Sequence, residues 1–133
     1  MTPELTYLVL SAILAFVQVM VAATAATSQI GVRANAGNRD NIPRFEGFCG
    51  RAYRAHSNML ENLILFAIIV LSANAAGIST AMTVLGVQIF FFARLVYAIV
   101  YWLGIPWVRS IVWLVSVIGM ALIATELLSR AVF

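Results

Sequence analysis

Residues 51–62 read RAYRAHSNMLEN and lead directly into the wholly apolar stretch LILFAIIVL at residues 63–71. Charged and amide side chains therefore enter a hydrophobic segment of membrane length. In lipid, each charge near the bilayer centre costs roughly 2.5–3.5 kcal/mol, so such side chains must be paired or must line a polar cavity inside a helix bundle. The stretch predicts a transmembrane helix that carries a functional site.

The composition indicates a membrane protein along the whole chain. Of the 133 residues, 63% are hydrophobic and 10% are charged, and the mean hydropathy is +1.00. This is too apolar for a soluble domain. A helix needs about 20 residues to cross the hydrocarbon core, and four stretches are long enough, at roughly residues 5–26, 55–76, 80–103 and 107–128. We expect an all-α integral membrane protein, a single four-span domain over residues 1–133 whose first span is retained and not cleaved as a signal peptide.

The distribution of arginine predicts the orientation. The connection between the first two predicted spans is rich in arginine and the third connection is followed by Arg109, whereas the connection near residues 74–79 has no charge. Positive charge favours the cytoplasmic side. We expect the first and third connections in the cytoplasm and both termini on the far side, with Arg130 weakly opposing this.

The types of polar residue exclude some classes of site. Basic residues are all arginine, which suits bidentate binding of carboxylate or phosphate, although ordinary anchoring explains Arg33, Arg39 and Arg44 equally well. Cys49 and His56 are the single cysteine and histidine, so we expect no disulfide and no metal site built from them. The basic connection is too short and too poor in aromatic residues for a nucleic-acid module.

The polar residues of the second predicted span converge on one face. At about 100° per residue, a stripe of roughly 80° holds Arg51, Arg54, Asn58 and Glu61, with Asn62 at its edge. His56 points to nearly the opposite side, where a packed or interfacial histidine is the favoured reading and contact with a ligand would come across a subunit boundary.

The third predicted span carries a matching stripe. Arg94, Tyr97 and Tyr101 are spaced i, i+3, i+7 and cover about 60° of the helix. A tyrosine pair at this spacing is often an interfacial aromatic belt, but Arg94 lies roughly 15 Å inside its span. A charged side chain at that depth favours a functional site over an aromatic belt.

Depth relates the two stripes. Glu61 also lies about 15 Å inside its span, which predicts an ion pair with Arg94. The two tyrosines then lie near Asn58 and Arg54. At the mouth of this cleft Arg109 and Ser110 begin the fourth span, where Arg109 could equally be a snorkelling anchor. A cytoplasm-facing cleft with excess positive charge suits an anionic ligand.

The same residues carry a resemblance to a known family. Residues 54–62, RAHSNMLEN, resemble the second-helix signature of the membrane-associated proteins in eicosanoid and glutathione metabolism (MAPEG), in particular the microsomal glutathione transferases. Residues 92–97, FARLVY, with Tyr101 are similar to the third helix of the leukotriene-synthesising members. The length, the four spans and the long basic first connection also fit.

The resemblance implies a homotrimer of four-helix subunits with glutathione bound between neighbouring subunits. It implies that glutathione is bound by Arg54, His56, Asn58, Glu61, Arg94, Tyr97 and Tyr101. Arg51 and Arg33 are added to this set on a poorer match, because the first connection aligns less well. Arg109 matches the arginine that stabilises the glutathione thiolate, with Ser110 as a minor donor.

The implied activity is that of a glutathione transferase or peroxidase of detoxification. The thiolate would attack a lipophilic electrophile or a lipid hydroperoxide that arrives from the membrane lipid, with glutathione as co-substrate and without a metal or a nucleic acid. Ser57 and Trp113 depart from the prostaglandin-synthesising branch, which argues against eicosanoid substrates. Two alternatives stay open: a non-catalytic lipid- or glutathione-binding scaffold and, ranked last, a small proton-coupled exporter that depends on Glu61.

Overall fold

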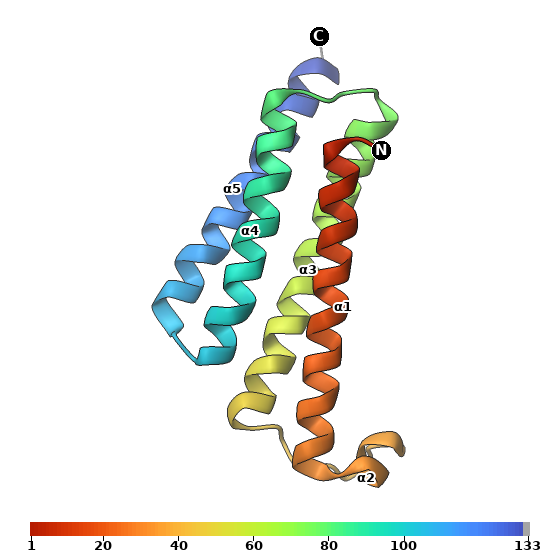
Figure 1. Cartoon of the computed structure of the whole chain (residues 1–133), viewed down its shortest axis with the longest axis vertical. Helices are drawn as coiled ribbons and strands as arrows, with labels where there is room; N and C mark the ends of the chain where they lie inside the picture. Colours follow the sequence, from red (N-terminus) through yellow and green to blue (C-terminus); the bar gives the residue numbers. More distant parts are fainter. Residues whose placement is uncertain (132–133) are drawn as a thin grey trace.

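The computed structural model describes residues 1–131, which form a bundle of long helices (Figure 1). Helix α1 covers Pro3–Ile30, α3 covers Gly47–Ala75, α4 covers Ala81–Leu103 and α5 covers Pro106–Ala131, while the short α2 covers Val32–Ala36. The four long helices are each long and apolar enough to cross a membrane. The prediction of four spans is confirmed.

Helix α3 begins well before the predicted span. It starts at Gly47 instead of residue 55, a difference of 55 − 47 = 8 residues. Hydropathy marks only the apolar part of a helix, whereas a helix continues as long as its backbone bonds and side chains allow. The arginine-rich segment before residue 55 is therefore helical, which places Arg51 and Arg54 on the same rigid element as Asn58.

The long helices run alternately up and down. Figure 1 shows the N-terminus of the chain, the α3–α4 connection and the end of α5 at one end of the bundle, and the α4–α5 turn and α2 at the other. We call these the terminal end and the turn end. Helix α1 packs mainly on α3, and α4 packs mainly on α5. The molecule therefore consists of two helix pairs, which meet mostly where α4 contacts α1 and α3.

The pair α4–α5 is held by a close backbone approach. A Cβ atom added to Gly86 would lie 2.7 Å from the carbonyl oxygen of Gly119, and one added to Gly119 would lie 2.7 Å from the carbonyl oxygen of Gly86. Only glycine permits this distance. Small residues at helix crossings are a common way of packing helices in lipid.

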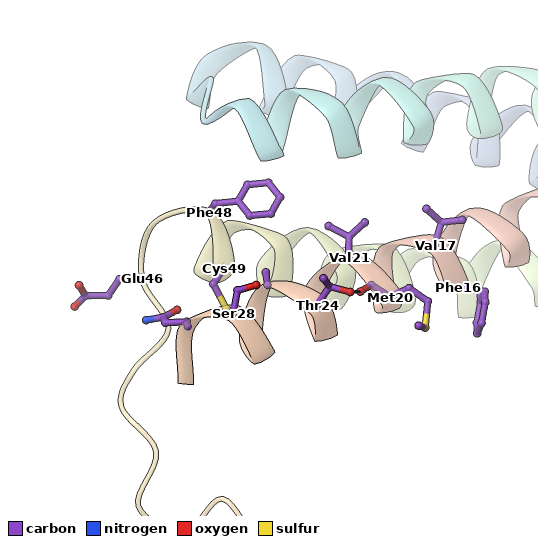
Figure 2. Close-up of a pocket in the computed structure, with 11 residues that line it drawn as sticks. Phe16, Val17, Met20, Val21, Thr24, Ser28, Glu46, Phe48 and Cys49 are labelled. Atoms are coloured by element: carbon purple, nitrogen blue, oxygen red, sulfur yellow. Dashed lines mark hydrogen bonds between the residues drawn. The ribbon is translucent and has the colours of Figure 1, made fainter. Parts of the chain in front are cut away.

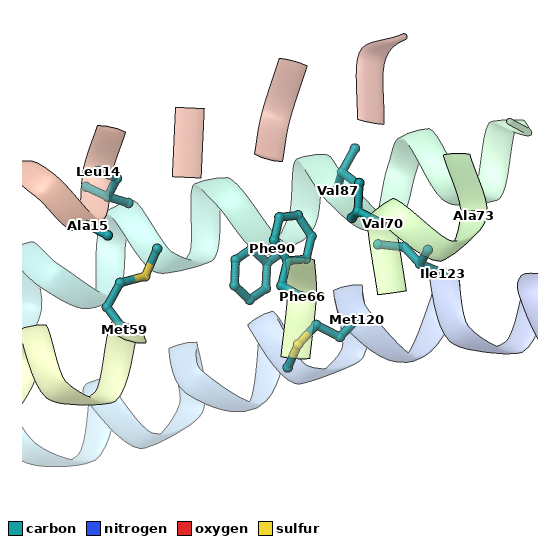
Figure 3. Packing of buried hydrophobic residues seen from close by; sticks show 10 residues of the cluster. All are labelled: Leu14, Ala15, Met59, Phe66, Val70, Ala73, Val87, Phe90, Met120 and Ile123. Atoms are coloured by element: carbon teal, nitrogen blue, oxygen red, sulfur yellow. The ribbon is translucent and has the colours of Figure 1, made fainter. Parts of the chain in front are cut away.

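Apolar side chains fill the centre of the bundle. Phe66 of α3 and Phe90 of α4 stack with ring centroids 3.8 Å apart (Figure 3). Around them lie the other buried apolar residues Leu14, Ala15, Met59, Val70, Ala73, Val87, Met120 and Ile123. This core separates the two ends of the bundle, where the polar groups gather.

At the terminal end a buried carboxylate joins α1 to α4. Glu4 is only 2% exposed, and its Oε1 accepts hydrogen bonds from the hydroxyls of Ser79, at 2.9 Å, and Thr83. Thr83 also forms a capping box with Thr80 at the start of α4. The carboxylate thus lies at the N-termini of two helices, where the helix dipoles favour negative charge.

Candidate functional site

The two polar stripes face each other at the turn end, as predicted from their spacing. Arg54 donates from Nε to the hydroxyl of Tyr101 at 3.1 Å. One helical turn deeper, Arg94 donates from Nη2 to Oδ1 of Asn58 at 2.8 Å. These two hydrogen bonds connect α3 to α4, and they place charged groups of both helices around one space.

The predicted ion pair between Glu61 and Arg94 is wrong. Arg94 binds Asn58, Glu61 is exposed, and within residues 1–131 the ion pair formed is Arg130 with Glu126. Asn58 lies about 4.5 Å from Glu61 along the helix axis, at 1.5 Å per residue. The depth comparison placed Tyr101 beside Arg54 correctly, but Arg94 bonds about one helical turn away from its predicted partner, at Asn58.

Arg94 is buried next to the site, beside Asn58 and Tyr97. Its side chain is 0% exposed, and its guanidinium carbon lies 4.2 Å from the ring centre of Tyr97. Its Nε and Nη1 have no hydrogen-bond partner within residues 1–131. The aromatic face and the amide of Asn58 therefore replace a counter-ion.

A cavity of about 330 Å³ opens between α3, α4 and α5. Each of its lining residues has a charged, hydroxyl or amide group, and they are Tyr53, Arg54, Ser57, Asn58, Glu61, Tyr97, Tyr101 and Arg109. Two guanidinium groups and one carboxylate face this space, which we call the polar cavity. Most of the predicted ligand-binding residues meet there within a single chain.

Arg109 reaches the polar cavity because the α4–α5 turn is tight. Gly104 adopts φ 78°, in the left-handed region that suits glycine, and Pro106 already starts α5. The guanidinium carbon of Arg109 lies 4.7 Å from the ring centre of Tyr101. The cationic group is therefore held against an aromatic face at the edge of the cavity.

Arg51 lies on the turn side of the same region. Its Nε donates to the carbonyl oxygen of Trp102 at 3.2 Å. A smaller cavity of about 200 Å³ is lined by Arg51, Arg54, Tyr101 and Arg109 together with the turn residues. Arg51 thus adds positive charge next to the polar cavity without lining it.

An apolar extension adjoins the polar cavity along α5. A cavity of about 400 Å³ shares Asn58, Tyr97 and Arg109 with the polar cavity and continues over Ser110, Trp113 and Leu114. Trp113 is 38% exposed and Leu114 is 53% exposed. Ser110 therefore lies where polar and apolar surfaces meet.

Two predicted site residues lie elsewhere. Arg33 is on the exposed helix α2 (Figure 1). His56 is half-buried, and its Nδ1 is buried without a partner in residues 1–131. Neither residue lines the cavities between α3, α4 and α5. Their assignment to the site depends on a second subunit and stays a prediction.

A larger apolar groove of about 760 Å³ runs along α1 and the start of α3 (Figure 2). Phe16, Met20 and Phe48 are among its lining residues, and Glu46 is the charged residue at its polar end. Cys49, which the sequence left without a role, also lines it. The groove shares no lining residue with the polar cavity, so the two are separate within one chain.

The sequence did not assign a role to Asn62. In the structure Asn62 donates from Nδ2 to the backbone carbonyl of Asn58 at 2.8 Å and lies 3.3 Å from Oδ1 of the same residue. Two asparagines spaced i, i+4 on a helix face are neighbours. This spacing was the signal that could have identified Asn62.

A family model covers almost the whole chain. The model of the MAPEG family matches residues 5–129, a range that includes parts of all four long helices. The chain belongs to the MAPEG family. This confirms the resemblance seen in residues 54–62 and 92–97, the helical membrane bundle and the integral, multi-pass membrane location. Among curated proteins and among solved structures, nothing matches the chain.

Membership of the MAPEG family gives the polar cavity a chemical context. The family acts on glutathione and lipophilic substrates at membranes, and it includes glutathione transferases and peroxidases as well as members that are not enzymes. In this MAPEG protein the polar cavity and its apolar extension lie side by side. A polar and an apolar surface therefore adjoin on one chain.

Proposed function

We propose that this MAPEG protein is a glutathione-dependent transferase or peroxidase that activates the thiol of glutathione in the polar cavity. The observation that supports this most directly is the composition of the lining. Arg54 and Arg109 provide positive charge, the tyrosines and Asn58 provide neutral donors, and Glu61 provides a single carboxylate.

The charges of glutathione are complementary to this lining. Glutathione has two carboxylates, which suit the guanidinium groups through charge-assisted hydrogen bonds. Its ammonium group suits Glu61, which is exposed and forms no ion pair within residues 1–131. A simple anion would leave Glu61 unused, so the lining favours a ligand with charges of both signs.

Arg109 is the residue proposed to activate the thiol. A thiol with a pKa of about 8.5 must fall by roughly two units to be mostly ionised at neutral pH, which corresponds to about 2.7 kcal/mol. A charge-assisted hydrogen bond contributes about 1.5–3 kcal/mol. One guanidinium can therefore supply most of the shift, with Ser110 and Tyr101 as minor donors.

The second substrate would lie over Ser110, Trp113 and Leu114. In a transferase reaction, the sulfur electron pair forms the bond to carbon and the leaving group departs with its own pair. In a peroxidase reaction, two glutathione molecules reduce the hydroperoxide to an alcohol and water and become one disulfide. Both begin with the same thiolate, so the activation step is common to them.

A non-catalytic lipid-binding scaffold is the second candidate, and the groove along α1 favours it. Its volume of about 760 Å³ and its apolar lining would hold an acyl chain without any reacting group. The exporter had been ranked last because Arg94 was expected to hold Glu61. That reason does not apply in the structure, and membership of the MAPEG family now argues against the exporter instead.

We also propose a homotrimer whose polar cavities face the cytoplasm. The arginine-rich turn end supports this orientation, and a neighbouring subunit would bring Arg33 and His56 toward the site. Accessibility of cysteines introduced at Gly104 and Ser129 in oriented vesicles, combined with chemical crosslinking, tests both points. Gly104 reacting from the extracytoplasmic side, or a crosslinked species other than a trimer, would contradict them.

Thermal unfolding of the detergent-purified protein tests the proposed function. At a hundredfold excess over Kd, a ligand of the native state adds about 2.7 kcal/mol of stability. Glutathione should therefore raise the Tm, whereas its dimethyl ester should not, because the guanidinium groups need free carboxylates. Equal stabilisation by both, or by neither, counts against the polar cavity as a glutathione site.

A further inference from the structure

The amide of Asn62 has a fixed orientation. Its Nδ2 lies 2.8 Å from the backbone carbonyl oxygen of Asn58. A carbonyl oxygen only accepts hydrogen bonds, so the end of the Asn62 amide that faces it must be the NH2 group. The same NH2 group lies 3.3 Å from the side-chain oxygen of Asn58.

A second donor approaches Asn58 from α4. Nη2 of Arg94 lies 2.8 Å from Asn58 Oδ1, and a guanidinium has no acceptor. The NH2 group of Asn62 and the guanidinium of Arg94, both of which donate hydrogen bonds, therefore approach the same atom, Oδ1 of Asn58. If the Asn58 amide turned over, its NH2 group would face both donors.

Burial prevents the neighbours from adapting to such a flip. Arg94 is 0% exposed and Asn62 is 8% exposed, so neither can exchange its bond to Asn58 for water. Leaving a buried donor unsatisfied costs about 1–3 kcal/mol, and more for a charged group. The arrangement therefore holds the Asn58 amide in one orientation.

The NH2 group of Asn58 then points away from both neighbours. Asn58 lines the polar cavity, and the side-chain hydrogen bonds it makes within residues 1–131 engage its oxygen. Its two N–H donors remain available to a ligand.

We infer that Asn62 and Arg94 are positioning residues that lock the Asn58 amide, so that Asn58 donates to an acceptor oxygen of glutathione, either a carboxylate or a peptide carbonyl. The inference rests on the proposed function and extends it to residues that contact Asn58 but do not line the polar cavity. Arg94 acts through Asn58, since it does not itself reach the cavity.

Titration calorimetry on the detergent-purified full-length protein tests the inference. Asn58→Ala should weaken glutathione binding about tenfold or more, as expected for a lost hydrogen bond to a charged or strongly polar oxygen. Asn62→Leu, which keeps the volume but removes the donor, should weaken binding about three- to tenfold. Under turnover conditions KM for glutathione should rise while kcat at saturation stays unchanged, because Arg109 is untouched.

The decisive comparison uses Asn62→Leu in two backgrounds. If Asn62 acts through Asn58, the substitution should have no further effect on Kd once Asn58 is alanine. An effect of equal size in both backgrounds would show that Asn62 only supports the packing of α3, and would overturn the inference. Gln18→Leu is the matched control, because Gln18 is also a buried amide (1% exposed) but lines none of the cavities of the site; its Kd should be that of the unchanged protein.

The outcomes separate the inference from the proposed function. If the unchanged protein does not bind glutathione, the proposed function fails. If it binds and Asn62→Leu binds equally well, the inference alone fails. Should Asn62→Leu not fold, Asn62→Ser provides the same comparison with a smaller donor, and Arg94→Lys tests the other positioning residue. Both variants should weaken glutathione binding only when Asn58 is present. An effect that persists with alanine at position 58 again overturns the inference.

Discussion

The guanidinium of Arg109 lies over the ring of Tyr101, with its carbon 4.7 Å from the ring centre. The same tyrosine accepts a hydrogen bond from Arg54 through its hydroxyl. One side chain thus orients two cations in different ways, by its aromatic face and by its oxygen. Because the ring covers a face of the Arg109 guanidinium, the N–H groups at the edge remain available to a thiolate.

Arg109→Leu should remove the ultraviolet absorbance of glutathione thiolate at neutral pH and slow turnover by about a hundredfold, the size of a two-unit pKa change. Binding should persist through Arg54, Asn58 and Glu61, and loss of rate with retained binding identifies an activating group. Raising the pH should partly restore the rate, because the thiol then ionises without help. Arg130→Leu, which removes an arginine at the terminal end, is the control. A normal thiolate signal in Arg109→Leu would make Arg109 only an anchor.

Tyr101→Phe and Tyr101→Leu should separate the two roles of this residue. The phenylalanine variant keeps the ring beneath Arg109 and removes the acceptor for Arg54. It should weaken glutathione binding a few-fold and lower the thiolate absorbance only slightly, because Tyr101 is a minor donor to the thiolate. The leucine variant should lose both properties. Calorimetry and absorbance on the same samples measure them, and identical behaviour of the two variants would contradict the assignment.

A double-mutant cycle should show coupling between Arg94 and Asn58. Arg94→Leu combined with Asn58→Leu should lose less stability than the sum of the single changes, by about 1.5–3 kcal/mol, since a hydrogen bond to a charged group is lost only once. Arg94→Leu combined with Glu61→Gln should be additive. Denaturant unfolding in detergent provides the free energies. Coupling between Arg94 and Glu61 in the second cycle would indicate that the two side chains interact, which would contradict the structure.

Thr83→Val should destabilise the terminal end without affecting the site. The hydroxyl of Thr83 donates to the buried Glu4, so its loss should cost about 1–3 kcal/mol. Thr125→Val, at an exposed position of α5, should change stability by less than about 0.5 kcal/mol. The Kd for glutathione should be unchanged in both variants, and a weaker Kd in Thr83→Val would indicate that the two ends of the bundle are coupled.

The number of spans and the facing of the polar stripes could be predicted because both depend on local periodicity. Helical spacing and the matched depth of the two spans together bring Arg54 toward Tyr101, which the structure confirms. The partner of Arg94 could not be predicted in this way. Asn58 and Glu61 lie within one helical turn of each other on α3, and the side-chain packing that selects Asn58 is not visible in the helical spacing.

Other parts of the site lay outside the reach of a single sequence. The i, i+4 spacing of Asn58 and Asn62 was visible in the sequence, but the bond of Asn62 to a backbone carbonyl was not, because such a bond leaves no pattern of complementary side chains. Arg33 and His56 were assigned through the resemblance to a trimeric family. Their expected contacts lie in a neighbouring subunit, which a single chain does not contain.

The close contact between Gly86 and Gly119 has a consequence for how a ligand enters. Backbone atoms packed this tightly favour movement of α4 and α5 as one body, whereas Arg51 and Arg54 of α3 bond to that body at the turn end through their Nε atoms. Polar bonds of this kind can be exchanged for bonds to an incoming anion. We therefore expect a ligand that takes over the bonds of Arg51 and Arg54 to offset the cost of separating α3 from the α4–α5 pair at the turn end.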